Sequence, residues 1–95
     1  MIERKVTNTR KDENGRIIDL CNPVEWWSPR TADEVIIDIE ESFYEYYLVV
    51  GGQKVKLKVI NGSVEKHLRT DPNKTTKNFL EILPVLDSTL YKWKH

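Results

Sequence analysis

Two adjacent tryptophans, Trp26 and Trp27, stand just before Arg30 in the proline-flanked stretch CNPVEWWSPR. Indole faces can stack on nucleobases or bind cations, and the N-terminus of a helix attracts anions. In an extended connection between a strand and a helix, neighbouring side chains point opposite ways. We therefore expect one tryptophan to cover the end of the core while the other faces solvent or a ligand. The alternative is that both tryptophans close a thin core as a lid.

A second polar cluster follows a predicted strand in the stretch HLRTDP, residues 67–72. Arg69, Thr70 and Asp71 lie where the strand gives way to a turn, a common place for functional residues. If the turn brings this cluster to the first one, the two form a single recognition surface. The alternative is structural, with Asp71 in a turn and Arg69 paired with an acid of the helix. The predicted binding residues are Trp27, Arg30, Arg69, Thr70, Asp71 and Asn78.

A predicted strand with the sequence QKVKLKVI carries lysines on one face. A basic face with an aromatic residue can follow a nucleic-acid backbone while a base stacks on the ring. The alternative is a solvated sheet face whose lysines discourage edge pairing. This second candidate face consists of Tyr47, Lys54, Lys56 and Lys58.

Few residues could support catalysis. A hydrolytic site built from His67 and Asp71 would need a nucleophile or a metal, and the sequence indicates neither. Cys21 is the only cysteine, which excludes an intramolecular disulfide and a zinc site built on thiolates. We therefore expect no enzymatic activity, no cofactor and no metal.

The composition is that of one small globular domain: 95 residues, 39% hydrophobic, 32% charged and with a formal net charge of zero. Zero net charge favours neither nucleic acid nor an anionic membrane. The first ten residues contain no apolar signal segment, and no apolar run is long enough to span a membrane. We expect a cytoplasmic monomer or homodimer with a protein partner and no membrane contact, with nucleic acid or a nucleotide as the alternative partner.

The clearest element is a β-hairpin around Gly51-Gly52, where FYEYYLVV runs into QKVKLKVI. Apolar residues alternate with lysines, which is the period of a half-buried strand, and a diglycine suits a two-residue turn with positive φ. The resulting register pairs Leu48 with Val55, Tyr46 with Leu57, Tyr44 with Val59, Glu45 with Lys58 and Tyr47 with Lys56.

Asparagine-glycine pairs predict two further turns. A two-residue loop at Asn61-Gly62 would pair Val59 with Val64 and Val55 with Leu68, but would place Lys66 on the apolar face. A hairpin around Asn14-Gly15 would pair Arg10 with Asp19 and Glu13 with Arg16.

One amphipathic helix is predicted between the hairpins. It begins either at the Thr31/Glu34 capping box or at Ser28 with Pro29 in the first turn. The acid-rich opposite face is expected to be solvated. The apolar stripe consists of Ala32, Val35, Ile36, Ile39 and Phe43.

A second short helix is predicted with Thr75 or Thr76 as its cap and Pro84 as its end. The order β-β-α-β-β-β-α then predicts an α+β fold, with a small, mainly antiparallel sheet packed on one amphipathic helix. Residues 1–84 form the single domain, and residues 85–95 form an amphipathic tail. The apolar face of the second helix is Phe79, Leu80 and Leu83, and that of the tail is Leu86, Leu90 and Trp93.

The motifs LCNP, WWSPR, LRTDP and NFLEILP resemble those of a family of short bacterial proteins defined as a domain of unknown function. The similarity spans about residues 5–84 and implies no activity. The chain departs from the family pattern at Phe79 and Ile82, where the family is more polar, so the tail is expected to pack there or to share a partner. We expect a small non-catalytic binding or protein-interaction domain, with nucleotide or single-stranded nucleic-acid binding as the alternative. The matching positions are Cys21, Asn22, Pro23, Trp27, Pro29, Arg30, Arg69, Thr70, Asp71, Asn78, Leu80, Leu83 and Pro84.

Overall fold

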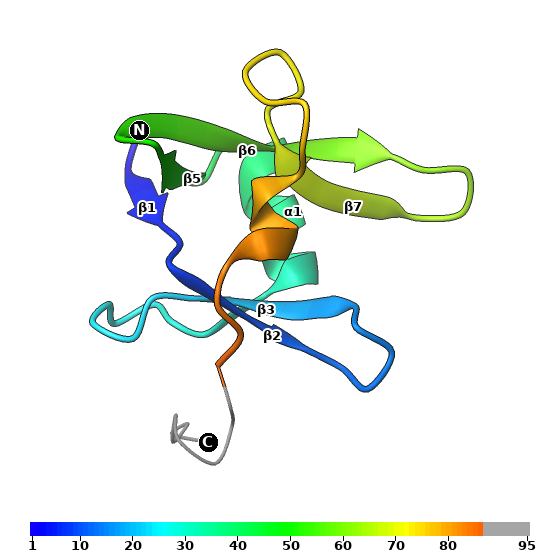
Figure 1. Cartoon of the computed structure of the whole chain (residues 1–95), viewed down its shortest axis with the longest axis horizontal. Coiled ribbons are helices and arrows are strands. Elements are labelled where there is room, and N and C mark those ends of the chain that lie inside the picture. The colour runs from blue at the N-terminus through cyan, green and yellow to red at the C-terminus, as the bar shows by residue number, and fades with distance from the viewer. Residues whose placement is uncertain (87–95) are drawn as a thin grey trace.

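The computed structural model describes residues 1–86 of the chain. These residues contain seven strands, one α-helix and one 3-10 helix. The strands form a four-stranded and a three-stranded sheet, and the α-helix packs against both (Figure 1). The predicted α+β class, mainly antiparallel on one helix, is confirmed. No helix within residues 1–86 is long and apolar enough to cross a bilayer. The elements are β1 (Glu3–Lys5), β2 (Asn8–Lys11), β3 (Ile17–Cys21), β4 (Arg30–Thr31), α1 (Ala32–Glu40), β5 (Glu45–Val50), β6 (Gln53–Asn61), β7 (Lys66–Thr70) and the 3-10 helix η1 (Phe79–Ile82).

The four-stranded sheet has the order β1-β5-β6-β7, with β1 parallel to β5 and the other pairs antiparallel. The predicted β5–β6 register is confirmed where the strands pair, with Leu48 opposite Val55 and Tyr47 opposite Lys56. Both turn glycines have positive φ, 55° and 79°. The expected inward face is buried, whereas Glu45 forms its ion pair with Lys56 and not with Lys58. The buried residues of this face are Tyr46, Leu48, Val55 and Leu57.

The predicted two-residue loop at Asn61-Gly62 is wrong. A four-residue loop connects β6 to β7, so Val59 lies opposite Leu68 and not opposite Val64. Leu68 lies on the inner face with either loop, but the longer loop moves it from a position opposite Val55 to one opposite Val59. The longer loop also leaves Lys66 at the exposed end of the strand, where it forms an ion pair with α1. With the two-residue loop Lys66 would lie opposite the buried Leu57, so the cost of placing a lysine on the apolar face outweighs the local preference of the turn sequence.

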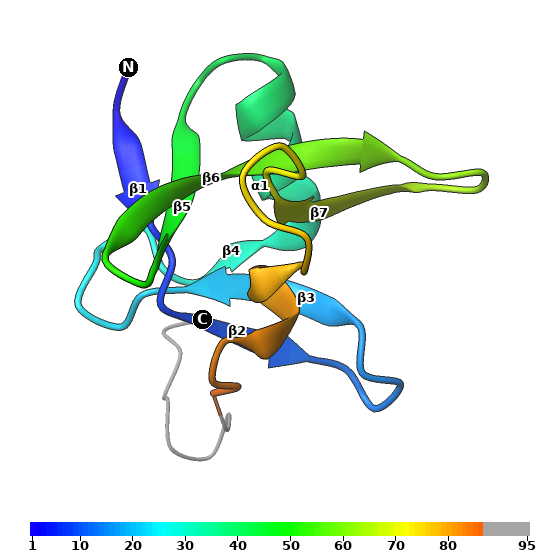
Figure 2. The ribbon, with the colours of Figure 1, turned by 45° about the horizontal axis from the view of Figure 1, so that its top comes forward.

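The three-stranded sheet has the order β2-β3-β4 and contains the predicted N-terminal hairpin. Arg10 lies opposite Asp19 as expected, and their side chains form an ion pair at 2.8 Å. A β-bulge follows Arg10 and shifts the pairing, so the Asp12 N–H donates to the Arg16 carbonyl at 2.9 Å. The predicted pairing of Glu13 with Arg16 is therefore wrong. The tip of this β2–β3 hairpin and the tip of the β6–β7 hairpin project from the same side of the molecule in both ribbon views (Figure 2).

The chain crosses from one sheet to the other at Val6 and Thr7. The Val6 N–H donates to the Tyr47 carbonyl in the first sheet, and the Thr7 N–H donates to the Cys21 carbonyl in the second, both at 2.9 Å. One core therefore forms between both sheets and α1. It contains Val6, Leu20, Trp27, Val35, Ile36, Tyr46, Leu48, Leu57, Leu68 and Leu80.

The capping box of Thr31 and Glu34 begins α1, as predicted. The Thr31 hydroxyl accepts from the Glu34 N–H, and the Glu34 carboxylate accepts from the Thr31 N–H, both at 3.1 Å. The alternative start at Ser28 and Pro29 is wrong, because β4 intervenes.

The helix ends before Phe43, the last residue of the predicted apolar stripe. Ser42 has a φ of 59°, and the Phe43 N–H donates to the Asp38 carbonyl at 2.8 Å, which is the pattern of a Schellman end. Phe43 is consequently 59% exposed, and its predicted place in the core is wrong. The other four members of the stripe, Ala32, Val35, Ile36 and Ile39, are buried or partly buried.

A single 3-10 turn, η1, replaces the predicted second helix. Asn78 caps it by accepting from the Leu80 N–H at 3.1 Å. The predicted caps, Thr75 and Thr76, are wrong, and the Thr75 hydroxyl instead forms a hydrogen bond with the Thr70 hydroxyl at 2.8 Å.

Beyond η1 the chain pairs with the edge of the three-stranded sheet. Val85 makes a parallel bridge with Thr9, and the Leu86 N–H donates to the Thr9 carbonyl at 2.8 Å. The first two residues of the predicted tail therefore contact the domain. The remaining positions of that tail, 87–95, lie outside the described residues.

Candidate functional site

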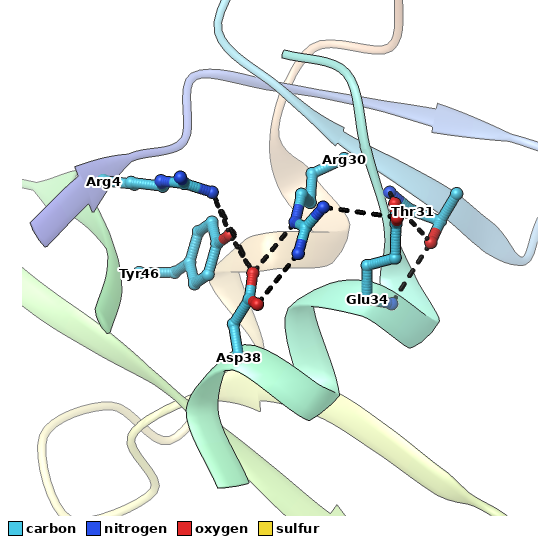
Figure 3. Close-up of polar contacts among 6 residues, drawn as sticks. All are labelled: Arg4, Arg30, Thr31, Glu34, Asp38 and Tyr46. Carbon is cyan, nitrogen blue, oxygen red and sulfur yellow. Dashed lines mark hydrogen bonds and ion pairs between the residues drawn. The ribbon is translucent and has the colours of Figure 1, made fainter. Parts of the chain in front are cut away.

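The carboxylate of Asp38 on α1 is buried and accepts hydrogen bonds from residues of two strands, β4 and β5 (Figure 3). Arg30 of β4 donates Nε to Oδ2 and Nη2 to Oδ1, both at 2.9 Å. The Tyr46 hydroxyl of β5 donates to Oδ2 at 2.5 Å. Arg4 of β1 donates to the Tyr46 hydroxyl at 2.8 Å, and its Nη1 lies 3.9 Å from the Asp38 carboxylate. Four elements thus meet at one buried charge.

The geometry of this network sets its protonation states. Burial alone raises the pKa of Asp38, but the hydrogen bonds from Arg30 and Tyr46 outweigh it, so the pKa lies below its ordinary value. Burial and the bond to Asp38 raise the pKa of Tyr46 to about 12, and the bond to Asp38 raises the pKa of Arg30. At neutral pH the carboxylate is ionised and the tyrosine is neutral. This distribution suits a structural ion pair better than an acid–base catalyst.

The predicted role of Arg30 as an anion-binding group conflicts with its contacts. Besides Asp38, its guanidinium contacts Glu34 at 3.2 Å. The Glu34 carboxylate also accepts the Thr31 N–H, so an acid of the chain already occupies the N-terminus of α1. Arg30 is therefore matched by two internal carboxylates.

One tryptophan covers the core and the other faces solvent, as predicted, although the loop that carries them consists of turns and not of extended chain. Trp27 is buried, and its ring packs edge-on against Tyr46, with the centroids 5.7 Å apart and the planes at 85°. Trp26 is 85% exposed. The loop that carries them is closed by the Asn22 N–H, which donates to the Ser28 hydroxyl at 2.9 Å. The predicted binding residue Trp27 is thus a core residue, and Trp26 is the accessible ring.

Arg69, Thr70 and Asp71 lie close to Asn78, but their polar groups form hydrogen bonds within the same segment, residues 68–78. Arg69 donates to the carbonyls of Thr70 and Thr75 at 2.8 and 3.2 Å. Thr70 is fully buried, and its N–H donates to the Asn78 side chain. The Asp71 carboxylate accepts the N–H two residues later at 2.9 Å, which is the expected Asx turn. The predicted pairing of Arg69 with an acid of the helix is not among the contacts of the described residues.

Two asparagine amides cap the free edges of the four-stranded sheet. On the β7 edge, Asn78 accepts from the Thr70 N–H and donates to the Leu68 carbonyl, at 3.2 and 3.3 Å. On the β1 edge, Asn22 donates to the Lys5 carbonyl at 2.9 Å. Unpaired edges invite pairing with other chains, and side chains that occupy their polar groups prevent it. Asn78 therefore has a structural role that its position in the sequence does not reveal.

The lysines of the alternative face project from β6, but acids neutralise two of them. Lys54 pairs with Glu3 at 2.5 Å and lies 4.6 Å from the centroid of the Tyr47 ring. Lys56 pairs with Glu45 at 3.3 Å. Lys58 forms no ion pair within residues 1–86 and lies directly opposite Arg69.

The two halves of the predicted recognition surface belong to different sheets, with Arg30 in β4 and Arg69 in β7. No hydrogen bond or ion pair within residues 1–86 links Trp27 or Arg30 with the cluster around Arg69. His67 and Asp71 lie four residues apart along β7 and its end, roughly 13 Å, so they cannot hydrogen-bond directly. Residues 1–86 also contain no group of three or more His, Cys, Asp or Glu that could hold a metal ion.

The sequence does not predict the burial of Asp38 and Arg4, two of the three buried charged residues within residues 1–86; the third, Asp19, is the expected partner of Arg10. The charge pattern places Asp38 among the solvated acids of the helix, yet Asp38 follows Val35 by about one helical turn and borders the apolar stripe. Arg4 alternates with the buried Val6, which places both on the inner side of the chain. The periodicity of the neighbouring apolar residues places both positions on a buried face, but a charged residue there is ordinarily read as exposed.

These features define a small two-sheet α+β domain held together by a buried arginine–aspartate–tyrosine network. No protein-family model, curated protein or solved structure matches the chain. What the domain binds must therefore be inferred from its own surfaces.

Replacing Asp38 with asparagine should destabilise the domain strongly. The substitution keeps the shape of the side chain but removes the ionised acceptor of Arg30 and Tyr46. Breaking a buried charged pair costs about 3–5 kcal/mol. Because the Arg30 side chain is 30% exposed and can turn towards water, we expect the lower end, about 3 kcal/mol, in the free energy of unfolding measured with urea.

Asp33→Asn is the matched control, because Asp33 is an exposed acid of the same helix, and it should change stability by less than about 0.5 kcal/mol. Since folding lowers the pKa of Asp38, its contribution is present above the unfolded pKa of about 3.9 and is lost as pH falls through the folded value. The wild-type advantage over Asp38→Asn should therefore hold from about pH 5 to 7 and shrink below about pH 4. Equal stability of the two proteins at neutral pH would contradict the assigned role.

Asn78→Ala should expose the β7 edge and uncap η1. The N–H groups of Thr70 and Leu80 and the carbonyl of Leu68 lose their partner, so we expect a loss of about 2 kcal/mol in the free energy of unfolding. The Thr70 amide hydrogen should also exchange faster with solvent. Asn73→Ala, in the exposed part of the same loop, is the control and should match the wild type. The capping role is refuted if the two alanine variants behave alike.

Proposed function

We propose that this chain is a small non-catalytic protein-interaction domain with a contact surface centred on Trp26. The observation that supports this proposal is that Trp26 and Val24, on the same loop, are 85% and 88% exposed while Trp27 anchors that loop in the core. Tryptophan is enriched among the residues that dominate interface energetics. Leaving such a ring in water costs solvation free energy that a partner would recover.

Internal hydrogen bonds hold the loop in one shape. The Glu25 N–H donates to the Asn22 carbonyl at 2.9 Å, and the Ser28 N–H donates to the Glu25 carbonyl at 3.3 Å. The Asn22 amide in turn binds β1. A contact residue on a loop that is already ordered loses less entropy when it binds, so affinity per unit of area rises. The loop therefore combines an apolar contact with pre-organisation.

The test compares two exposed valines. Proteins captured with the tagged wild-type chain would be purified, and their dissociation constants measured for Val24→Ser, Trp26→Ala and Val64→Ser. Val64 is 94% exposed at the tip of the β6–β7 hairpin and serves as the control. We expect Val24→Ser and Trp26→Ala to weaken binding at least about tenfold, as hot-spot truncations do, with Val64→Ser unchanged. A partner that binds all four proteins equally would refute this surface.

A second candidate function is binding of nucleotides or single-stranded nucleic acid on the outer face of the four-stranded sheet. Lys58 and Arg69 lie directly opposite each other, and like charges in that position repel. An anionic ligand between them would relieve the repulsion, and the Tyr47 ring on the same face offers a stacking surface. The pairing of Lys54 and Lys56 with Glu3 and Glu45 weakens this proposal.

Titration with a fluorescent oligonucleotide at several salt concentrations tests the second candidate. Affinity should fall as salt rises, and Lys58→Ala should reduce the slope by roughly 0.7 for each lost contact to a single-stranded phosphate. Lys74→Ala, an exposed lysine of the loop after β7, should leave the slope unchanged. Absence of binding at low salt would remove this candidate.

A further inference from the structure

Four aromatic rings enclose the side chain of Arg4. Its Cζ atom lies 3.5 Å from the centroid of the Tyr44 ring, 5.4 Å from the centroids of both Trp26 and Trp27, and 5.7 Å from that of Tyr46. Arg4 is only 4% exposed, although it belongs to a three-residue strand at the edge of a sheet. Its guanidinium therefore sits in an aromatic cage.

No part of this cage comes from β1, the strand that fills it. The tryptophans belong to the loop after β3, and the tyrosines belong to β5 and the residue before it. Asp38 of α1 places a carboxylate 3.9 Å from the guanidinium, and the Tyr46 hydroxyl accepts its hydrogen bond. Aromatic faces together with a carboxylate are the groups by which proteins bind organic cations. A planar guanidinium can stack on an aromatic ring while it donates hydrogen bonds in its own plane, whereas an ammonium donates hydrogen bonds but has no plane with which to stack.

Outside the cage, the side chains of β1 contribute little, and its backbone is held by the ladder with β5 and by the Asn22 amide, which donates to the Lys5 carbonyl. Met1 and Ile2 are 68% and 65% exposed, and Glu3 contributes only a solvent-exposed ion pair with Lys54. The strand pairs on one side only, in parallel with β5. Extended peptides commonly bind proteins by adding a strand to a sheet edge and placing alternate side chains in pockets. β1 has this geometry, with Arg4 as the residue in the pocket.

We propose that Trp26, Trp27, Tyr44, Tyr46 and Asp38 form a guanidinium-binding site. β1 fills this site within the chain, and an arginine-bearing extended segment of another chain pairs with β5 and fills it when β1 is released. The proposal goes beyond the protein-interaction surface above, because it does not require a partner on the outward side of Trp26.

The test uses the full chain with the substitution Arg4→Ala, which removes the internal cation. Methylguanidinium should raise the midpoint of thermal unfolding and change tryptophan fluorescence in a saturable manner, and methylammonium should do so less. A peptide with the sequence MIERKVT, residues 1–7, should bind at least about tenfold more tightly than methylguanidinium, because it adds backbone hydrogen bonds. The same peptide with alanine in place of arginine should not bind.

Two proteins serve as controls. Lys5→Ala, one residue further along β1, keeps the cage filled and should show no response to methylguanidinium. The wild type should bind the peptide at least about tenfold more weakly than Arg4→Ala, since its own β1 competes at a high effective concentration. If Arg4→Ala is unfolded in buffer, methylguanidinium or the peptide should restore the far-ultraviolet circular dichroism of the folded domain. The site is refuted if no saturable response occurs in either case.

Hydrogen exchange of the wild type tests the release of β1 separately. The β1 amides should exchange through a local opening, faster than the amides of β5 and β6 that exchange by global unfolding. If both exchange at one rate, release does not occur and the proposal fails. A concentration-dependent dimer that Arg4→Ala abolishes would identify the incoming segment as β1 of a second copy. Peptide binding by a protein that stays monomeric would identify another protein as the source.

Discussion

The carboxylate of Asp38 can be buried only if its charge is matched from several directions at once. Moving an ionised carboxylate out of water costs several kcal/mol even after relaxation, and a single neighbour rarely offsets that cost. Here Arg30 supplies two hydrogen bonds and Tyr46 one, and Arg4 adds a second positive charge behind the tyrosine. These partners belong to both sheets. The charge is therefore matched only when both sheets and the helix have assembled, which couples them into one unit.

This constraint also shapes the surface. Because Arg30 is held against α1, the loop before it must return over the core, where Trp27 packs on Tyr46. The side chain of the neighbouring Trp26 therefore lies in solvent. The two edges of the four-stranded sheet, β1 and β7, are capped by Asn22 and Asn78. Contacts to other molecules are thus more readily made by the loop, or by exchange of β1, than by simple edge pairing.

Sequence patterns predicted correctly the elements whose structure depends mainly on residues close to them in the chain. The alternation of Val55 and Leu57 with lysines and the diglycine turn specified the β5–β6 register, and Thr31 with Glu34 specified the start of the helix. The β6–β7 loop was mispredicted because a tertiary effect, the exclusion of Lys66 from the apolar face, outweighs the local preference of an asparagine-glycine turn. β1 was missed because it consists of three charged residues. A charge in a short pattern indicates surface, and only the folded partners show that Arg4 and Asp38 lie inside.

Several residues of the sequence motifs stabilise the fold through burial or internal hydrogen bonds, which leaves fewer positions free to contact a partner. Cys21 is fully buried, and burial raises the pKa of its thiol to about 12, so it is inert as a nucleophile. Arg30 donates to α1, the Thr70 hydroxyl donates to the Lys77 carbonyl in the loop before η1, and Asn78 caps η1. Residues that serve folding in this way would be shared by any chain with the same fold, whatever it binds. Under the two proposals made above, a binding preference of this chain would depend on Trp26, which is exposed, and on Arg4, which fills the aromatic cage.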